Sequence, residues 1–215
     1  MPHRHPSFLN RLGHFIKGPN PLHPAVWEGR LSPLTFRRFQ PEDVSQCLEI
    51  YKLNEPRRFP EGVLSEYEKC LREQSSYFLV AEKDGQIVAT GGISYFQRPC
   101  FAVLCFGLVR PDHQNTGIGT ASLLARLALL KKDEPVYRVF IFAVAKSFGF
   151  YERFGFGYFK PWKDIHGQEH PTGSLLISYP EAQKCRQLLA DYGISVPHDE
   201  DQVPIRELRN PILKS

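Results

Sequence analysis

The segment from Gln114 to Leu124, QNTGIGTASLL, places two glycines one residue apart, directly before an apolar helical pattern. Gly117 and Gly119 remove Cβ atoms at points where backbone N–H groups would face outward. The N-terminus of the following helix would add unpaired N–H donors and the positive end of the helix dipole. We therefore expect this segment to form an anion site that suits phosphate groups.

Two common nucleotide-binding motifs do not match this segment. A P-loop requires a lysine after its glycines, but Ile118, Gly119 and Thr120 follow Gly117 without one. The Rossmann fingerprint requires a third glycine, and no glycine follows Gly119 in this segment. ATP and NAD are therefore poorly supported as ligands. A tight loop that only packs against the protein stays open as the alternative.

The pattern around this loop alternates between strands and helices. Apolar or alternating runs predict strands at 34–39, 76–96 (a hairpin that turns at Asp84-Gly85), 101–109, 136–144, 156–159 and 174–179. Helical periodicity predicts helices at 40–53, 63–74, 118–132, 147–155 and 180–193. This order predicts an α/β or α+β fold with a mixed sheet, and a parallel crossover through the helix that follows the glycines.

The composition narrows the function classes. The chain has 215 residues, of which 42% are hydrophobic and 23% charged, as in an ordinary soluble protein. The net charge of +4 is too weak to indicate a nucleic-acid partner. Five cysteines without a C-x-x-C pair show no metal-ligand spacing and predict reduced thiols in the cytoplasm. No apolar run approaches the ~18 residues of a membrane-spanning helix.

Residues 1–30 differ from the rest of the chain because they hold five prolines and no acidic residue before Glu28. Apolar side chains between Phe8 and Ile16 form one helical stripe, which predicts a short amphipathic helix. Such a helix could bind a partner or a second copy of the chain, lie on a membrane surface, or pack on its own domain. The predicted boundaries are 1–30 for this arm, 31–180 for the main domain and 181–215 for a C-terminal helix and tail.

Two segments together resemble the GNAT superfamily of N-acyltransferases. The run VRPDHQNTGIGTASLL is similar to the family's pyrophosphate-binding motif, Gln/Arg-x-x-Gly-x-Gly/Ala, through Gln114, Gly117 and Gly119. The run FYERFGF, from Phe150 to Phe156, is similar to the family's second signature, and AEKDGQIVATGGI resembles its second and third strands. Two motifs in the expected order identify the family more strongly than either alone.

The resemblance implies a mixed, mostly antiparallel sheet of about six to seven strands with a V-shaped splay, flanked by about four helices. It implies acetyl-CoA, or another acyl-CoA, as co-substrate. The pantetheine arm would pair with the edge of FGLV, where a bulge near Gly107 opens the splay. The implied cofactor-binding residues are Leu108, Val109, Gln114, Asn115, Thr116, Gly117, Ile118, Gly119, Thr120, Ser147 and Phe150.

The implied reaction is direct attack by a primary amine on the thioester. Tyr151 occupies the family's general-acid position, and its phenol can donate a proton to the departing thiolate. Aromatic packing is the alternative role for Tyr151. Many relatives carry a glutamate in the fourth strand, but FAVLCFGLV has no carboxylate, so the base stays open among water, Glu82, His113, His166 and His170.

Cys105, in the same strand, could form an acyl-enzyme. No adjacent base is evident that would make its thiolate, so we expect a buried apolar thiol instead.

The acceptor amine, on a small molecule or a protein, is expected in a pocket shaped by two loops, one between the first helices and one between the late strands. The residues predicted to bind it are Arg57, Arg58, Tyr95, Trp162 and His166. A solvated rim is the alternative for this set. A second hypothesis is a non-catalytic protein that senses acyl-CoA or holds a partner. The missing strand carboxylate favours that hypothesis and the retained Tyr151 opposes it.

Overall fold

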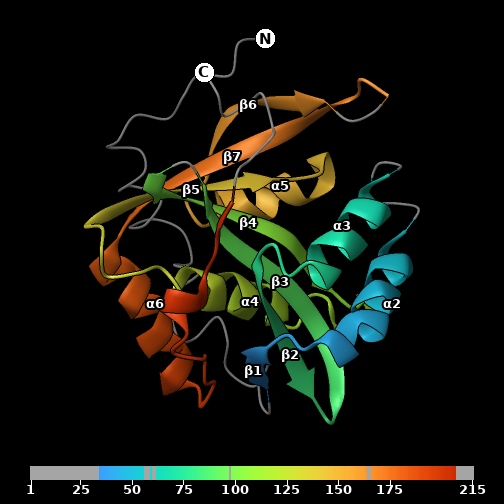
Figure 1. The fold of residues 1–215 in the computed structure, drawn as a ribbon, viewed down its shortest axis with the longest axis horizontal. Coiled ribbons are helices and arrows are strands. Elements are labelled where there is room, and N and C mark those ends of the chain that lie inside the picture. Colours follow the sequence, from blue (N-terminus) through green and yellow to red (C-terminus); the bar gives the residue numbers. More distant parts are fainter. Residues whose placement is uncertain (1–33, 56–58, 60–61, 97, 164–165, 207–215) are drawn as a thin grey trace.

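The fold is built on one mixed sheet with helices on both faces (Figure 1). The computed structural model describes residues 34–55, 59, 62–96, 98–163 and 166–206. Its strands are β1 (Thr35–Arg38), β2 (Tyr77–Lys83), β3 (Gln86–Phe96), β4 (Arg98–Val109), β5 (Val136–Phe142), β6 (Gly157–Lys163), β7 (Glu169–Ser178) and β8 (Ile205–Arg206). Its α-helices are α2 (Val44–Asn54), α3 (Val63–Arg72), α4 (Ile118–Leu127), α5 (Ala145–Glu152) and α6 (Tyr179–Asp191).

The strand order is β1-β2-β3-β4-β5-β7-β6, and the short β8 pairs with β3. Neighbouring strands are antiparallel except in the β4–β5 and β3–β8 pairs. The parallel β4–β5 pair is connected through α4, which is the crossover that the sequence predicts. The predicted fold class is confirmed, although the described residues form eight strands and five α-helices rather than about six to seven and four.

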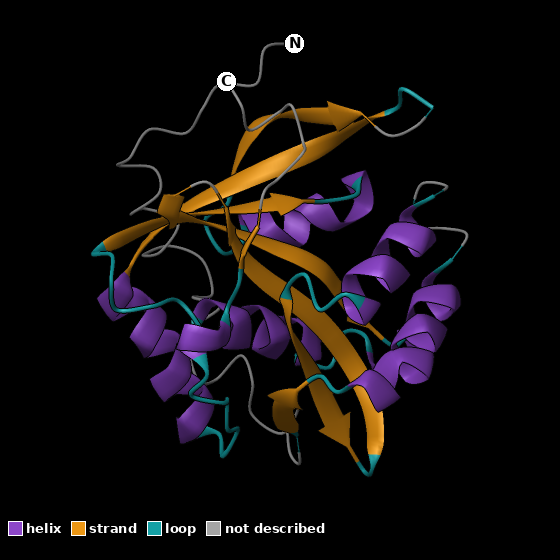
Figure 2. Ribbon diagram, in the orientation of Figure 1, coloured by secondary structure: helices purple, strands orange, loops and turns teal. Residues whose placement is uncertain are grey.

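The β2–β3 hairpin shows how the chain divides its core between the two faces of the sheet. Asp84 and Gly85 take positive φ angles of 51° and 76°, the geometry of a tight two-residue hairpin turn. Tyr77 of β2 packs with α4 and α6, whereas Phe78 packs with α2 and α3. Figure 2 shows the sheet running between these two groups of helices.

The C-terminal helix belongs to the same core as α4. Ala182, Cys185 and Leu189 of α6 are buried in the cluster that α4 contributes to, and the two helices contact each other. The described residues beyond 180 therefore pack on the same sheet as the rest, while the domain boundaries stay a prediction. The predicted arm at 1–30 lies outside the described residues.

β6 and β7 are longer than the sequence pattern indicates. The predicted strands cover only 156–159 and 174–179, but β6 extends to Lys163 and β7 begins at Glu169. Pro161 and Pro171 lie opposite each other, next to a register shift in this pair of strands. Proline lacks the N–H that a regular ladder uses, so an irregular stretch accommodates it.

Candidate active site

The sheet opens between β4 and β5. β4 pairs with β5 only from Phe101, opposite Arg138, to Leu104, opposite Ile141. Beyond Leu104, β4 continues to Val109, and no described strand pairs with that side of it. This divergence is the V-shaped splay that the sequence predicts, and it leaves one side of the end of β4 open to a ligand.

A β-bulge lies in β4 where the splay begins. Gly92 is opposite Cys105 and Thr90 is opposite Leu108, so Phe106 and Gly107 together face one residue of β3. The predicted bulge near Gly107 is confirmed, but the residue with positive φ (47°) is Phe106. This conformation is strained for a bulky side chain. A bulge changes the direction in which side chains point. Here the Phe106 ring packs on the ring of Tyr67 in α3, with centroids 4.7 Å apart.

The loop between β4 and α4 presents backbone donors. Asn115 and Gly117 have positive φ angles of 62° and 91°, which turn the chain sharply just before the helix. The first helical hydrogen bond runs from the N–H of Ala121 to the carbonyl of Gly117. No described backbone carbonyl accepts from the N–H groups of residues 115–120. This end of α4 can therefore donate several hydrogen bonds to an anion.

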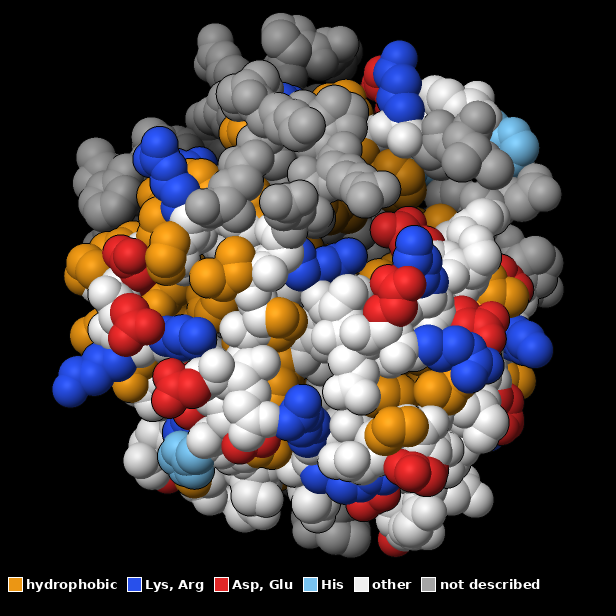
Figure 3. All heavy atoms as spheres, in the orientation of Figure 1, with side chains coloured by type: hydrophobic (Ala, Val, Ile, Leu, Met, Phe, Trp, Pro, Cys, Tyr) orange, Lys and Arg blue, Asp and Glu red, His pale blue; other side chains and the backbone are white. Residues whose placement is uncertain are grey.

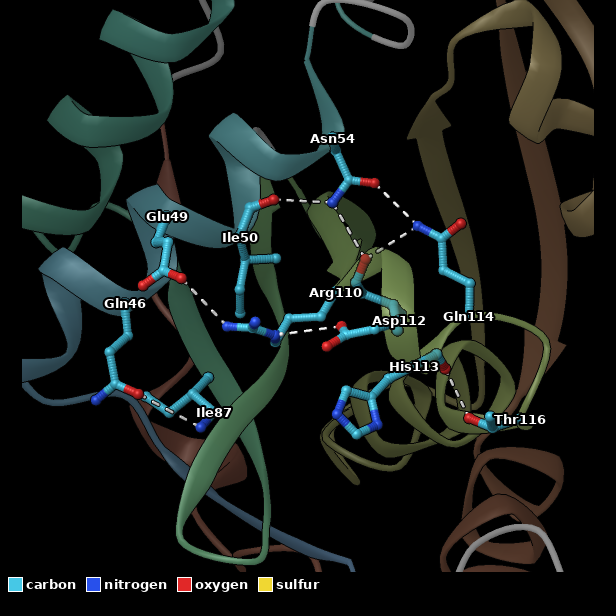
Figure 4. Close-up of polar contacts among 11 residues, drawn as sticks. Gln46, Glu49, Ile50, Asn54, Ile87, Arg110, Asp112, His113, Gln114 and Thr116 are labelled. Carbon is cyan, nitrogen blue, oxygen red and sulfur yellow. Dashed lines mark hydrogen bonds and ion pairs between the residues drawn. The ribbon is translucent and has the colours of Figure 1, made fainter.

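The side chain of Gln114 fixes this loop to the rest of the fold. Its Nε2 donates to Asn54 Oδ1 at 2.9 Å and to the carbonyl oxygen of Val109 at 3.1 Å. Asn54 Nδ2 donates to the same carbonyl at 3.1 Å, so the end of α2 is tied to the end of β4 (Figure 4). Gln114 thus has a structural role that the sequence did not indicate. A contact between Gln114 and the cofactor remains a prediction.

The loop is also braced near its start. Arg110 lies between Glu49 and Asp112, 3.3 Å from a carboxylate oxygen of each (Figure 4). Thr116 Oγ1 donates to the carbonyl of His113 at 2.6 Å. Side chains on both sides of the turn therefore hold its backbone in place, while its N–H groups stay available.

The surroundings of Gly119 have room for a side-chain carbon. A Cβ at this position would lie 3.8 Å from the side chain of Val109 and 3.9 Å from the ring of Phe150, which are ordinary contact distances. Packing within the chain therefore does not require glycine here. A glycine that the protein does not need for its own packing fits the close approach of a phosphate to the helix N-terminus.

Tyr151 reaches from α5 to the bulge of β4. A Cβ placed on Gly107 would lie 3.3 Å from the Tyr151 hydroxyl oxygen. The half-buried ring is held by edge-on contacts with Phe150 and Phe156, with centroids 5.0 and 5.6 Å away. One turn earlier, Ser147 Oγ donates to the carbonyl of Val144 at 3.0 Å. The phenol is thus both packed in an aromatic group and directed at the opening.

One residue at the opening was missed by sequence reasoning. Arg126 of α4 is only 2% exposed, and its guanidinium lies against the bulge at Gly107. The apolar pattern of this segment predicts the helix but assigns no role to Arg126. In the structure, every residue from Ala121 to Leu130 is buried. The signal was a single charged residue inside the apolar run ASLLARLALL, because arginine is seldom fully buried without a partner.

The predicted acceptor residues do not form one group. Tyr95 is 2% exposed, and its hydroxyl accepts from the backbone N–H of Lys131 at 2.9 Å, so it is a core residue rather than the wall of a pocket. Trp162 is half-buried on β6, and exposed His166 lies in the β6–β7 connection. Arg57 and Arg58 lie outside the described residues.

Two base candidates are occupied by other contacts. Glu82 Oε1 lies 2.7 Å from Arg37 Nη2, within a group that also contains Asp43. His170 is buried on β7, and its ring stacks on that of Trp162 with centroids 4.6 Å apart. Neither arrangement leaves an open carboxylate or imidazole at the bulge.

The Cys105 thiol is not prepared for nucleophilic chemistry. Burial raises the pKa of this thiol to about 11, and its Sγ donates to Ser76 Oγ at 3.4 Å. A thiol with this pKa is protonated at neutral pH, whereas the thiolate is the nucleophilic form. The expectation of an apolar, unreactive thiol agrees with this environment.

Other classes of site find little support in the described residues. No group of three or more His, Cys, Asp and Glu side chains there could hold a metal ion. No helix among them is long and apolar enough to cross a membrane. On the face drawn in Figure 3, acidic and basic side chains are intermingled rather than gathered by sign. That face lacks the basic patch typical of nucleic-acid-binding proteins.

Comparison with known proteins agrees with this geometry. A model of the acetyltransferase (GNAT) family matches residues 44–156, more than half of the chain. No curated protein matches the sequence. A GNAT-family protein from Desulfovibrio desulfuricans is 16% identical, with a TM-score of 0.57 over 68% of this chain and 99% of its own. The ribosomal-protein-S18-alanine N-acetyltransferase from Escherichia coli is 21% identical, with a TM-score of 0.52 over 67% and 94%.

A third solved structure carries a ligand. It is a Salmonella typhimurium protein with its cofactor acetyl-CoA, 15% identical, with a TM-score of 0.50 over 69% of this chain and 95% of its own. Structural likeness at these identities establishes the fold, and the family model establishes the relationship in sequence. The chain therefore belongs to the GNAT family of acetyltransferases.

Proposed function

We propose that this protein transfers an acetyl group from acetyl-CoA to a primary amine. The observation that carries the proposal is the pairing of two features along the open side of β4. Unpaired N–H groups at residues 115–120 lie at one end, and the Tyr151 hydroxyl lies at the bulge. Acetyl-CoA has a pyrophosphate and a thioester joined by an extended arm, which suits an anion site and a proton donor along one open strand edge.

The proposed donor site uses backbone groups more than side chains. The N–H groups of Asn115 to Thr120 would bind the pyrophosphate, supported by the positive end of the α4 dipole. Gly119, which packing within the chain does not require, supports this assignment. The pantetheine arm would lie along the unpaired side of β4, with Ser147 and Phe150 of α5 beside it.

The proposed reaction needs no covalent enzyme intermediate. The amine nitrogen attacks the thioester carbonyl carbon, and the N–H group of Val109, on the open side of β4, stabilises the oxyanion. The N–H group of Leu108, the other predicted donor, lies on the opposite edge of the strand, where Leu108 pairs with Thr90 of β3. The carbon–sulfur bond then breaks with its electron pair on sulfur, and Tyr151 donates its proton to the sulfur. The amine loses a proton to water, and Tyr151 regains one from solvent. The products are the acetylated amine and CoA.

The acceptor is proposed as a class rather than a compound. Trp162 and His166 on the β6–β7 hairpin are retained as candidate contacts. The E. coli relative acts, by its name, on an alanine of ribosomal protein S18. A peptide with a free N-terminal alanine therefore belongs in any panel of acceptors, beside small amines and lysine peptides. The five free cysteines support a reducing compartment, and we place the protein in the cytoplasm.

The donor site can be tested by Gly119→Asp. An acidic residue in the first turn of α4 suits the helix dipole, so the fold should be unaffected or slightly stabilised. The added carboxylate would repel the pyrophosphate, and calorimetry should show acetyl-CoA affinity reduced at least ~100-fold, since two negative groups then share a partly buried site. Gly119→Ala is the matched control, because its methyl group adds no charge.

Three results would count against the proposal. Equal acetyl-CoA affinity in the wild type and Gly119→Asp would remove the loop from the site. Binding of ATP or NAD without any binding of acyl-CoA would replace the proposed co-substrate. Tight binding of acetyl-CoA without acetylation of any amine would favour the non-catalytic acyl-CoA sensor.

A further inference from the structure

Arg126 is a buried cation with few partners. It lies in the last turn of α4 and is 2% exposed. Its Nε donates to the carbonyl of Ser122 at 3.0 Å, which is its only hydrogen bond among the described residues. No carboxylate in the described part of the chain forms an ion pair with it. Burying a charge without a counter-ion is strongly unfavourable, so such a residue needs an explanation.

Two glycines make room for this guanidinium. A Cβ on Gly91 would lie 2.9 Å from Arg126 Nε and 3.0 Å from Cζ. A Cβ on Gly107 would lie 2.9 Å from Nη2 and 3.2 Å from Nη1. Real Cβ atoms essentially never approach other atoms this closely, so the guanidinium fits against β3 and β4 only because both positions are glycine. The chain therefore directs a positive charge at the bulge.

The same place is reached by Tyr151. The Cβ position of Gly107 lies within 3.3 Å of the Tyr151 hydroxyl as well as of both Arg126 Nη atoms. The Nη atoms have no hydrogen-bond partner in the described residues. A proton donor and an unneutralised cation thus converge on one point of the splay, beside the backbone of Leu108.

We propose that Arg126 is a second catalytic group, which stabilises the thiolate of CoA as it leaves. This inference rests on the proposed function, because that reaction places negative charge on sulfur beside Tyr151. As the carbon–sulfur bond breaks, the electron pair stays on sulfur and the guanidinium pairs with it. Tyr151 then protonates the sulfur, and Arg126 also stabilises the resulting phenolate until solvent returns a proton. Charge stabilisation of this kind acts strongly in a site with little water.

The test measures binding of free CoA and of desulfo-CoA, which lacks the sulfur, as the pH rises from about 7 to about 9. In the full-length wild type, CoA affinity should rise about tenfold more than desulfo-CoA affinity, because the thiolate becomes populated and pairs with Arg126. In Arg126→Met this difference should vanish, and in Arg126→Lys it should be partly restored. The readout is calorimetric and needs no acceptor amine.

Several outcomes would overturn the inference. If CoA and desulfo-CoA respond equally to pH in the wild type, or if Arg126→Met keeps the difference, the guanidinium does not contact the sulfur. If succinyl-CoA binds much more tightly than acetyl-CoA and Arg126→Met removes that preference, Arg126 recognises a carboxylate instead. If no CoA derivative binds, the proposed function itself falls, and this inference falls with it.

Measurements of thermal stability distinguish a catalytic role of Arg126 from a purely structural one. Arg126→Met replaces an unpaired charge with an apolar side chain of similar length, so its melting temperature should equal or exceed that of the wild type. Turnover should fall about 10²–10³-fold, as when one charge-stabilising donor is removed. A large loss of stability in both Arg126→Met and Arg126→Lys, without the change in CoA binding, would assign the side chain to packing alone.

Discussion

Arg126 and Arg186 both reach the C-terminal part of α4, and their surroundings are opposite. Arg186 of α6 is surrounded by acceptors: the carbonyl oxygens of Ala128, Val196 and Pro197 and the carboxylate of Glu200. Arg126, two residues before Ala128, has one backbone carbonyl and two glycines beside it. Both Nη atoms of Arg186 therefore have hydrogen-bond acceptors, whereas the Nη atoms of Arg126 have none among the described residues.

This difference indicates a structural role for Arg186 and a role in the ligand site for Arg126. A buried charge with its partners in place holds segments together, and Arg186 joins α6, α4 and the chain after α6 in this way. A buried charge without partners is tolerated where a ligand completes its environment, which is why perturbed groups gather at functional sites. The contrast predicts that loss of Arg186 harms folding and that loss of Arg126 harms turnover.

The largest expected effect is on the proton donor that shares the site of Arg126. Tyr151→Phe should lower kcat about 10²–10⁴-fold, because the leaving thiolate loses its proton source. The double variant with Arg126→Met should lose less than the product of the two single effects, since both groups act on one atom. Steady-state kinetics on the three variants check this. Unchanged turnover in Tyr151→Phe would show that the phenol only packs.

The second-largest effect is expected for Arg126→Met. Its kcat should be lowered about 10²–10³-fold, while its KM for acetyl-CoA should change little. The guanidinium is proposed to act on charge that appears only in the transition state, so ground-state binding should be nearly unaffected. A higher KM with an unchanged kcat would place Arg126 in substrate binding instead.

Arg186→Met should show the reverse pattern. It leaves Glu200 and several buried carbonyl groups without a donor, which should lower the free energy of unfolding by about 2–4 kcal/mol. Urea denaturation measures this change, and the kcat of the folded fraction should stay within about twofold. If Arg186→Met and Arg126→Met lost equal stability, the proposed division of roles would be wrong.

The smallest expected effect concerns Arg37, a second arginine with carboxylate partners, and the size of this effect depends on pH. Burial alone would raise the pKa of Asp43, but hydrogen bonds from Arg37 and the Gln40 N–H hold that pKa below its ordinary value. The carboxylate therefore stabilises the folded state above about pH 4, and this contribution is lost as the pH falls further. Asp43→Asn should be less stable by about 1 kcal/mol at neutral pH. The gap should narrow as the pH falls below about 4, and a constant gap would exclude the ion pair as its cause.

The sequence predicts the parts of the site that depend on local pattern. The loop around Gly117, the crossover helix and the Asp84-Gly85 turn each follow from residues close in the chain, and the structure has all of them. Tyr95 could not be placed in the same way, because both faces of β3 are covered by apolar layers. Alternation along such a strand does not tell an outer wall from a core position.

Arg126 and Phe106 escaped prediction for a related reason. Arg126 makes sense only with Gly91 and Gly107, which lie 35 and 19 positions earlier in the chain. Phe106 takes a backbone conformation that favours glycine, although Gly107 stands next to it. Both depend on contacts between distant segments, which a local pattern does not record.

The central claim is that this chain transfers an acetyl group to an amine, and release of the CoA thiol tests it most directly. Full-length protein would be incubated with acetyl-CoA and a panel of small amines, lysine peptides and a peptide with N-terminal alanine. The account predicts thiol release that depends on an amine and falls at least ~100-fold in Tyr151→Phe. Acetyl-CoA binding with no amine-dependent thiol release from any member of the panel would contradict it.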